Sequence, residues 1–219
     1  MKRMKKIECM IISLCIGVII TFAFSVYAEA TEKSISAGII RLHVIANSDT
    51  DADQNLKLRV RDRVIEKAGS LFVGHKDKNS AIAKLTEHKE QIAQIAKSVV
   101  EEYGYDYEIS VTVGRSDFPT KTYGNATFPA GTYDALKIVI GEGEGKNWWC
   151  VLFPPLCFVD ATTATLTEES DQMLKSSLTD EQYDMITGEG GLPVQVKFKT
   201  YELWQESKIK FKNMLASLN

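Results

Sequence analysis

Three residue types that hydrolases use lie close together near position 45. His43 is followed by Ser48 and Asp49, so a base, a hydroxyl and a carboxylate fall within seven residues. Such groups together can activate a nucleophile. Ser48 lacks the glycines of a nucleophile elbow, which favours a structural histidine on a strand. The alternative left open is an exported hydrolase that uses His43 with Ser48 or Asp49.

Two further motifs resemble ligand-binding loops, and their spacing argues against both. Residues 141–146 carry three glycines and a lysine, but a phosphate-binding loop needs four residues between its glycines and a Ser or Thr where Asn147 stands. The acids between positions 49 and 53 open like a calcium loop, but Gln54 replaces the required glycine. These acids are better suited to capping a helix. We therefore expect no catalytic residue, no cofactor and no metal site.

The cysteines divide between two parts of the chain. Cys9 and Cys15 lie in the apolar segment at the amino terminus, which leaves Cys150 and Cys157 for the rest. A hairpin with residues 152–155 as its loop would set this pair on facing strands within bridging distance. We predict a disulfide worth about 2.5 kcal/mol on the chain-entropy model. Two buried thiols that behave as small apolar side chains are the alternative.

The amino terminus has the pattern of an export signal. A basic head at residues 2–6 precedes an apolar run at residues 9–26, and small residues follow between positions 26 and 30. The run is at the lower edge of the length that spans a bilayer. Residues 1–28 are therefore expected to be a signal peptide or an N-terminal membrane anchor. The remaining domain is expected outside the cytoplasm.

The charge balance limits the kinds of partner. Without residues 1–28 the chain carries a net charge of −6. Such a domain has no general attraction to nucleic acid or to an anionic membrane surface. We expect a protein partner, no nucleic acid and no small-molecule substrate.

The hydrophobic periodicity predicts a single α+β domain at residues 35–219. Its sheet is expected to be mostly antiparallel, with about five to six strands packed against three to four helices. We predict strands at 38–46, 107–113, 135–140, 148–153, 156–159 and 194–199. We predict helices from about 53 to 71 and at 80–103, one or two short helices over 166–178 and 179–186, and a last helix over the carboxyl-terminal residues.

Two loops contain residues suited to contact a partner. The segment 114–133 holds aromatic side chains among Pro and Gly, and residues 141–147 form a glycine-rich, acidic tip that we expect to be flexible. The aromatic side chains either form an interface or cover the core. The partner-binding candidates are Tyr123, Asn125, Phe128, Lys146, Asn147, Trp148 and Trp149.

Several segments also resemble a known family. They are Arg41 to Asp49 (RLHVIANSD), residues 56–62 (LKLRVRD), 123–125 (YGN), 128–131 (FPAG) and, above all, 139–157 (VIGEGEGKNWWCVLFPPLC). Over residues 39–160 the chain is similar to the stage II sporulation protein R family. Residues 161–219 show no comparable likeness.

This resemblance implies a function that the residue chemistry does not reveal. It implies a signal made in the forespore and exported into the space between the forespore and mother-cell membranes. There the signal would trigger a membrane-embedded aspartic protease of the mother cell, which processes the precursor of a sigma factor. The family carries no assigned catalytic residues, in agreement with the motifs considered above.

Overall fold

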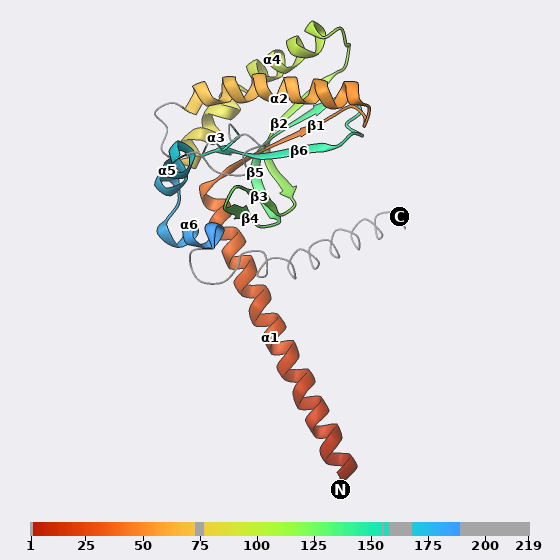
Figure 1. Ribbon diagram of the computed structural model, residues 1–219, viewed down its shortest axis with the longest axis vertical. Helices are drawn as coiled ribbons and strands as arrows, with labels where there is room; N and C mark the ends of the chain where they lie inside the picture. The colour runs from red at the N-terminus through yellow and green to blue at the C-terminus, as the bar shows by residue number, and fades with distance from the viewer. Residues whose placement is uncertain (1, 73–76, 155, 158–167, 189–219) are drawn as a thin grey trace.

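The computed structural model describes residues 2–72, 77–154, 156–157 and 168–188 (Figure 1). Within them the chain forms, in order, α1 (Lys2–Gly38), β1 (Ile40–Ile45), α2 (Asp51–Phe72), α3 (Lys78–Glu87), α4 (Lys89–Glu102), β2 (Ile109–Phe118), β3 (Lys121–Tyr123), β4 (Ala126–Phe128), β5 (Gly131–Ile140), β6 (Asn147–Phe153), α5 (Glu168–Ser177) and α6 (Asp180–Thr187). The α+β class is confirmed. The predicted strand at 194–199 and the carboxyl-terminal helix lie outside the described residues.

The main sheet has four strands in the order β2-β5-β1-β6. β5 pairs antiparallel with β2 but parallel with β1, and β6 pairs antiparallel with β1. The prediction of a mostly antiparallel sheet of five to six strands is therefore correct only in part. The described main sheet is mixed, and two of the described strands, β3 and β4, form a separate hairpin. The helices α2, α3 and α4 lead from β1 into β2, which lies two places away in the sheet. β5 then returns antiparallel to β2 and fills the place between them, where it runs parallel to β1.

One face of the sheet is covered by α2, α3 and α4 (Figure 1). The alternation of β1 sends Ile40, Leu42 and Val44 into this core, where each is fully buried. The predicted helix at 80–103 is in fact two helices. The break falls at His88, whose backbone angles (φ −101°, ψ 11°) leave the helical region while its N–H still bonds to Lys84.

The other face carries a second, smaller core. It is built from the last turns of α1, the β3–β4 hairpin, α5 and α6. The prediction of a loop over 114–133 is wrong, since β2 continues to Phe118, the β3–β4 hairpin follows, and β5 begins at Gly131. At α6 the predicted capping box is confirmed, with Thr179 and Gln182 each bonding to the other's backbone.

The helix α1 joins the apolar amino-terminal segment to this second core without a break (Figure 1). Its described apolar side chains from Met10 to Phe22, and Val26, are exposed, whereas Ile35 is fully buried. No helix in the described part of the chain has the length and hydropathy of a membrane span.

Candidate functional site

Arg41 is the largest side chain that the fold buries completely. It lies on the face of β1 opposite the three apolar side chains of the helix-covered core. Four aromatic rings surround its guanidinium, with the carbon Cζ 4.6 Å from the ring centre of Phe118, 5.2 Å from Tyr133, 5.5 Å from Phe128 and 5.9 Å from Tyr123. We call these four rings and Arg41 the arginine cage. Cation–π contacts of this kind stabilise a desolvated cation.

Hydrogen bonds fix the orientation of Arg41 within the cage. Its Nε donates to the carbonyl oxygen of Cys150 at 3.1 Å, and its Nη2 donates to the Tyr123 hydroxyl at 3.3 Å. No carboxylate in the described part of the chain forms an ion pair with it, and its Nη1 has no hydrogen-bond partner there. The charge is therefore balanced by ring faces and carbonyl dipoles.

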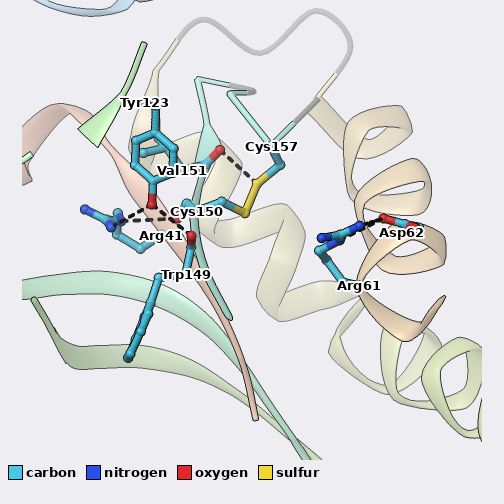
Figure 2. Close-up of a disulfide and its surroundings, with 8 residues drawn as sticks. All are labelled: Arg41, Arg61, Asp62, Tyr123, Trp149, Cys150, Val151 and Cys157. Carbon is cyan, nitrogen blue, oxygen red and sulfur yellow. Dashed lines mark hydrogen bonds and ion pairs between the residues drawn. A yellow bond between two sulfur atoms is a disulfide. The ribbon is translucent and has the colours of Figure 1, made fainter. Parts of the chain in front are cut away.

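Tyr123 connects the cage to the edge of the sheet. Its hydroxyl donates to the carbonyl oxygen of Trp149 at 2.8 Å while it accepts from Arg41, as Figure 2 shows. Burial raises the pKa of Tyr123, and the nearby Arg41 opposes that rise only in part. The β3–β4 hairpin is thus held against β6 by one buried hydroxyl.

The predicted Cys150–Cys157 disulfide is present in the structure, with the two Cα atoms 5.5 Å apart (Figure 2). The predicted reason is wrong, because the cysteines are not on facing strands. Cys150 lies in β6 and Cys157 lies in a turn that folds back when the N–H of Leu156 bonds to the carbonyl of Val151 at 3.1 Å. Residues 158 and 159 of the predicted strand lie outside the described residues.

The two adjacent tryptophans point to opposite faces of the sheet, as strand alternation predicts. Trp148 packs on the helix-covered core, and the guanidinium of Arg61 in α2 lies 4.1 Å from its ring centre. Trp149 packs on the second core, with the Lys121 amine 4.6 Å from its ring centre. Both side chains are half-buried.

His43 faces the same side as Trp149 and stacks on it with ring centres 5.8 Å apart. Its Nε2 lies 2.7 Å from Oδ1 of Asn147. Burial lowers the pKa of His43, the hydrogen bond to the Asn147 side-chain oxygen opposes that shift, and nearby Lys137 adds to it. In the structure His43 therefore pairs with Asn147 rather than with Ser48 or Asp49.

Ser48 and Asp49 form hydrogen bonds with the start of α2 and with the loop before β6. The Ser48 hydroxyl donates to Asp53 at 2.6 Å, and Asp49 accepts from the N–H of Lys146 at 2.7 Å. Burial opposes ionisation of Asp53, but hydrogen bonds from Ser48, Asn47 and other donors outweigh it and lower its pKa. The three groups of the hydrolase alternative are not joined by hydrogen bonds among the described residues.

The glycine-rich tip at residues 141–147 is fastened rather than flexible. The side chain of Asn47 accepts from the N–H of Glu142 at 3.1 Å, and the backbone carbonyl of Asn47 accepts from Glu144 at 3.1 Å. The N–H of Gly145 reaches the Ala46 carbonyl at 3.0 Å. A Cβ at Gly145 would overlap the carbonyl of Ser48, so only glycine allows this approach. The sequence analysis predicted a flexible tip because the groups that hold it, on Ala46 and Asn47, lie almost 100 residues earlier in the chain.

The structure separates the seven partner-binding candidates by exposure, and their contact with a partner stays a prediction. Those exposed to solvent are Asn125, Lys146 and Asn147; those half-buried are Tyr123, Trp148 and Trp149; Phe128 is fully buried in the arginine cage. Phe128 therefore offers no surface to a partner in this structure. The sequence analysis did not predict Arg41 as a site residue, although a permanently charged side chain on a strand whose other residues are apolar or histidine is the signal that could have found it.

These features define a class of protein. It is a small α+β domain in which a buried arginine, an aromatic hairpin and a disulfide together hold one edge strand of a mixed sheet.

Comparison with known proteins places the chain within a family. A family model described as Stage II sporulation protein R matches residues 36–163. The Stage II sporulation protein R of Bacillus subtilis (strain 168) is 37% identical over 191 residues, which cover 84% of this chain and 85% of the relative. No solved structure matches the chain. The chain belongs to the stage II sporulation protein R family.

Proposed function

We propose that this chain is an exported sporulation signal that activates a membrane-embedded aspartic protease, so that the precursor of the mother-cell sigma factor is processed. The observation that carries the proposal is the family match, which includes every strand of the main sheet and all five residues of the arginine cage. The relative is named for stage II of sporulation and not for an enzymatic activity.

The surface that contacts the protease, in this proposal, surrounds Trp149. Lys121 of β3 lies over Trp149 of β6, Asn147 begins the same strand, and Asn125 lies in the turn between β3 and β4. We call these four residues the Trp149 surface. Asn125 and Asn147 are exposed, and the Lys121 amine lies over the Trp149 ring. Lys121 forms no ion pair among the described residues. A half-exposed tryptophan beside a cation without an ion pair, with exposed amide side chains on the same two elements, has the composition of an interface hot spot.

The rigid support beneath this surface favours the same role. The Trp149 carbonyl is held by Tyr123, and Asn147 is held by His43 at 2.7 Å. A surface whose backbone is fixed in advance loses little entropy when a partner binds. In this proposal the arginine cage and the disulfide hold Trp149 in position and take part in no reaction.

Export from the forespore into the space between the two membranes is part of the proposal. The exposed apolar side chains of α1 suit either a removed signal or an anchor formed by residues 9–26. In either case the domain that begins at the buried end of α1 would face the mother-cell membrane, where the protease lies.

Reconstitution in a non-sporulating host tests the proposal. The chain is co-expressed with the aspartic protease and the sigma factor precursor, and the precursor is followed by immunoblot. We expect processing when the chain carries residues 1–28 and is exported, and none when the chain is omitted. An intact precursor in the presence of folded, exported chain would contradict the proposal.

A double variant in the same assay distinguishes the signalling function from the hydrolase alternative. Ser48→Ala with Asp49→Asn removes the candidate nucleophile and carboxylate, while the asparagine oxygen still accepts from the N–H of Lys146. A signalling ligand should keep processing near the wild-type level. Loss of processing by a variant that folds normally would favour the hydrolase.

A further inference from the structure

The strand β2 forms an edge of the main sheet and lacks the features that usually protect such an edge. All of its residues pair with β5 in one continuous register, from Ile109 opposite Ile140 to Phe118 opposite Gly131. In the sheet order β2-β5-β1-β6, no strand of the described chain lies beyond it (Figure 1). Residues 109–114 (ISVTVG) include no proline, no charged side chain and no bulge. An edge of this kind attracts a further strand.

The opposite edge of the sheet, β6, is already occupied in its middle. The carbonyl of Trp149 accepts from the Tyr123 hydroxyl at 2.8 Å, and the carbonyl of Val151 accepts from the N–H of Leu156 at 3.1 Å. Contacts within the described chain therefore use the groups that a further strand would need there. This leaves β2 as the edge of the main sheet that a further strand can extend.

The register identifies which backbone groups of β2 point outward. The N–H of Gly141 bonds to the carbonyl of Glu108, so the even-numbered residues of β2 face β5. The odd-numbered residues Ile109, Val111 and Val113 therefore direct their N–H and C=O groups away from the sheet. Their side chains pack on the helix-covered core. A strand bonded to these groups would direct every second side chain to the same side, toward α4.

A groove lies on that side, between α4 and the start of β2. It has a volume of about 570 Å³, and none of its lining residues belongs to β5, so it lies beside the outer edge of β2. Half-buried Ala93 and Ile109 give it an apolar floor. Side chains that a further strand directs toward α4 would enter this groove.

The groove is acidic. Its charged lining residues comprise three carboxylates and one amine, a net charge of −2: Glu90, Glu101, Glu108 and Lys97. Asp106 and the Tyr107 carbonyl already accept from the Lys97 amine, at 3.1 and 3.2 Å. Glu90 and Glu101 lie 3.2 and 3.8 Å from lysine amines in exposed ion pairs, which contribute little and give way to a competing cation.

Arginine and lysine side chains suit both the floor and the charge of this groove. Their aliphatic stems can cover the apolar floor while their cationic ends reach the carboxylates. We propose that β2 binds an extended, basic segment of a partner protein, which adds as a fifth strand and directs alternate arginine or lysine side chains into the groove. A second copy of this chain is a poorer occupant, because its own acidic groove would approach the first. The proposal is independent of the Trp149 surface, which lies at the opposite edge of the sheet.

Hydrogen exchange of single amides in the full chain tests the added strand. The probe is the peptide Arg-Thr-Arg-Thr-Arg-Thr-Arg, and Arg-Arg-Thr-Thr-Thr-Arg-Arg has the same composition and charge without the alternation. Before peptide is added, the amides of Ile109, Val111 and Val113 should exchange at least about tenfold faster than those of Ser110 and Thr112, which face β5. A saturating amount of the alternating peptide should slow the odd-numbered amides at least about tenfold, and the rearranged peptide should not.

A double variant tests the role of the acidic groove. Glu90→Gln with Glu101→Gln should raise the Kd of the alternating peptide roughly fivefold, because two ion pairs with the peptide are lost. The matched control is Glu66→Gln with Glu181→Gln, which changes the net charge equally at exposed positions outside the groove. Its Kd should stay within about twofold of the wild-type value. The Kd is read from the peptide concentration that gives half-maximal protection of the odd-numbered amides.

Four results would overturn the proposal. Slow exchange at the odd-numbered amides without peptide would mean that another part of the chain covers the edge. Protection that grows with the concentration of the protein itself would mean that a second copy occupies it. Equal protection by the two peptides, or an equal change of Kd in the two double variants, would show a general attraction of charge instead of an added strand.

Discussion

At the scale of single residues, Arg41 shows how a charge can be part of a core. Its guanidinium is fully buried without a carboxylate among the described residues, and four rings and two oxygens surround it. Arg41 bonds to the Cys150 carbonyl and the Tyr123 hydroxyl, and Tyr123 in turn bonds to the Trp149 carbonyl. Removal of Arg41 would therefore disturb the edge of the sheet as well as the second core.

Arg41→Ala should lower the free energy of unfolding by about 2–4 kcal/mol, through a cavity and two unpaired oxygens. Arg59→Lys is the control, because Arg59 is exposed and its guanidinium carbon lies 5.8 Å from the centre of the Tyr103 ring. The effect of this change should stay within about 0.5 kcal/mol. Urea unfolding measures both. A loss below about 1 kcal/mol for Arg41→Ala would show that the cage is not a stabilising element.

His43 gives stability a pH dependence. Burial lowers its pKa in the folded chain below the unfolded value, so protonation favours the unfolded state. This contribution is complete above the unfolded pKa of about 6.5 and is lost as the pH falls through the folded pKa. His43→Gln should therefore lose less stability than the wild type between pH 7 and pH 5 in denaturant titrations. Parallel curves for the two proteins would contradict this assignment.

Contacts between single residues were also the hardest feature to predict from the sequence. Alternation placed Trp148 and Trp149 on opposite faces correctly, because that depends only on local strand geometry. The cage was not predicted, because it brings Arg41 together with rings 77 to 92 residues further along the chain.

At the scale of elements, the loop at 141–147 depends on its close approach to the segment that precedes α2. Gly145→Ala should cost about 1–3 kcal/mol, because the new methyl group meets the Ser48 carbonyl and forces a backbone shift. Gly114→Ala is the control, since nothing lies within 4 Å of the added carbon. It should be neutral or slightly stabilising. Equal melting temperatures for the two variants would show that the loop is not held as described.

Helices and strands with strong periodicity were predictable, and irregular connections were not. The positions of β1, α2, β6, α5 and α6 follow from their apolar spacing and caps. The segment 114–133 was misread as a loop because its glycines and prolines mask short strands that pair across the β3–β4 hairpin. The parallel β1–β5 pair was missed because local alternation does not reveal the direction of a neighbouring strand.

At the scale of the whole molecule, the end of α1 belongs to the folded domain. Ile35 is fully buried in the second core, so residues after any signal cleavage should remain helical and packed. Ile35→Ala should cost about 2–5 kcal/mol, whereas Lys33→Ala, at an exposed position of the same helix, should change stability by less than about 0.5 kcal/mol. Similar values for both in chemical denaturation would place α1 outside the domain.

The central claim is that the chain acts by presenting the Trp149 surface to the protease. Two variants of the same strand test it most directly, because Trp148 and Trp149 are both half-buried and point to opposite faces. The measurement is the rate of sigma factor precursor processing in the reconstituted host, at equal amounts of folded, exported chain. Trp149→Ala should slow processing at least about tenfold, and Trp148→Ala should leave it near the wild-type rate. Wild-type processing by Trp149→Ala, or an equal loss in both variants, would contradict the account.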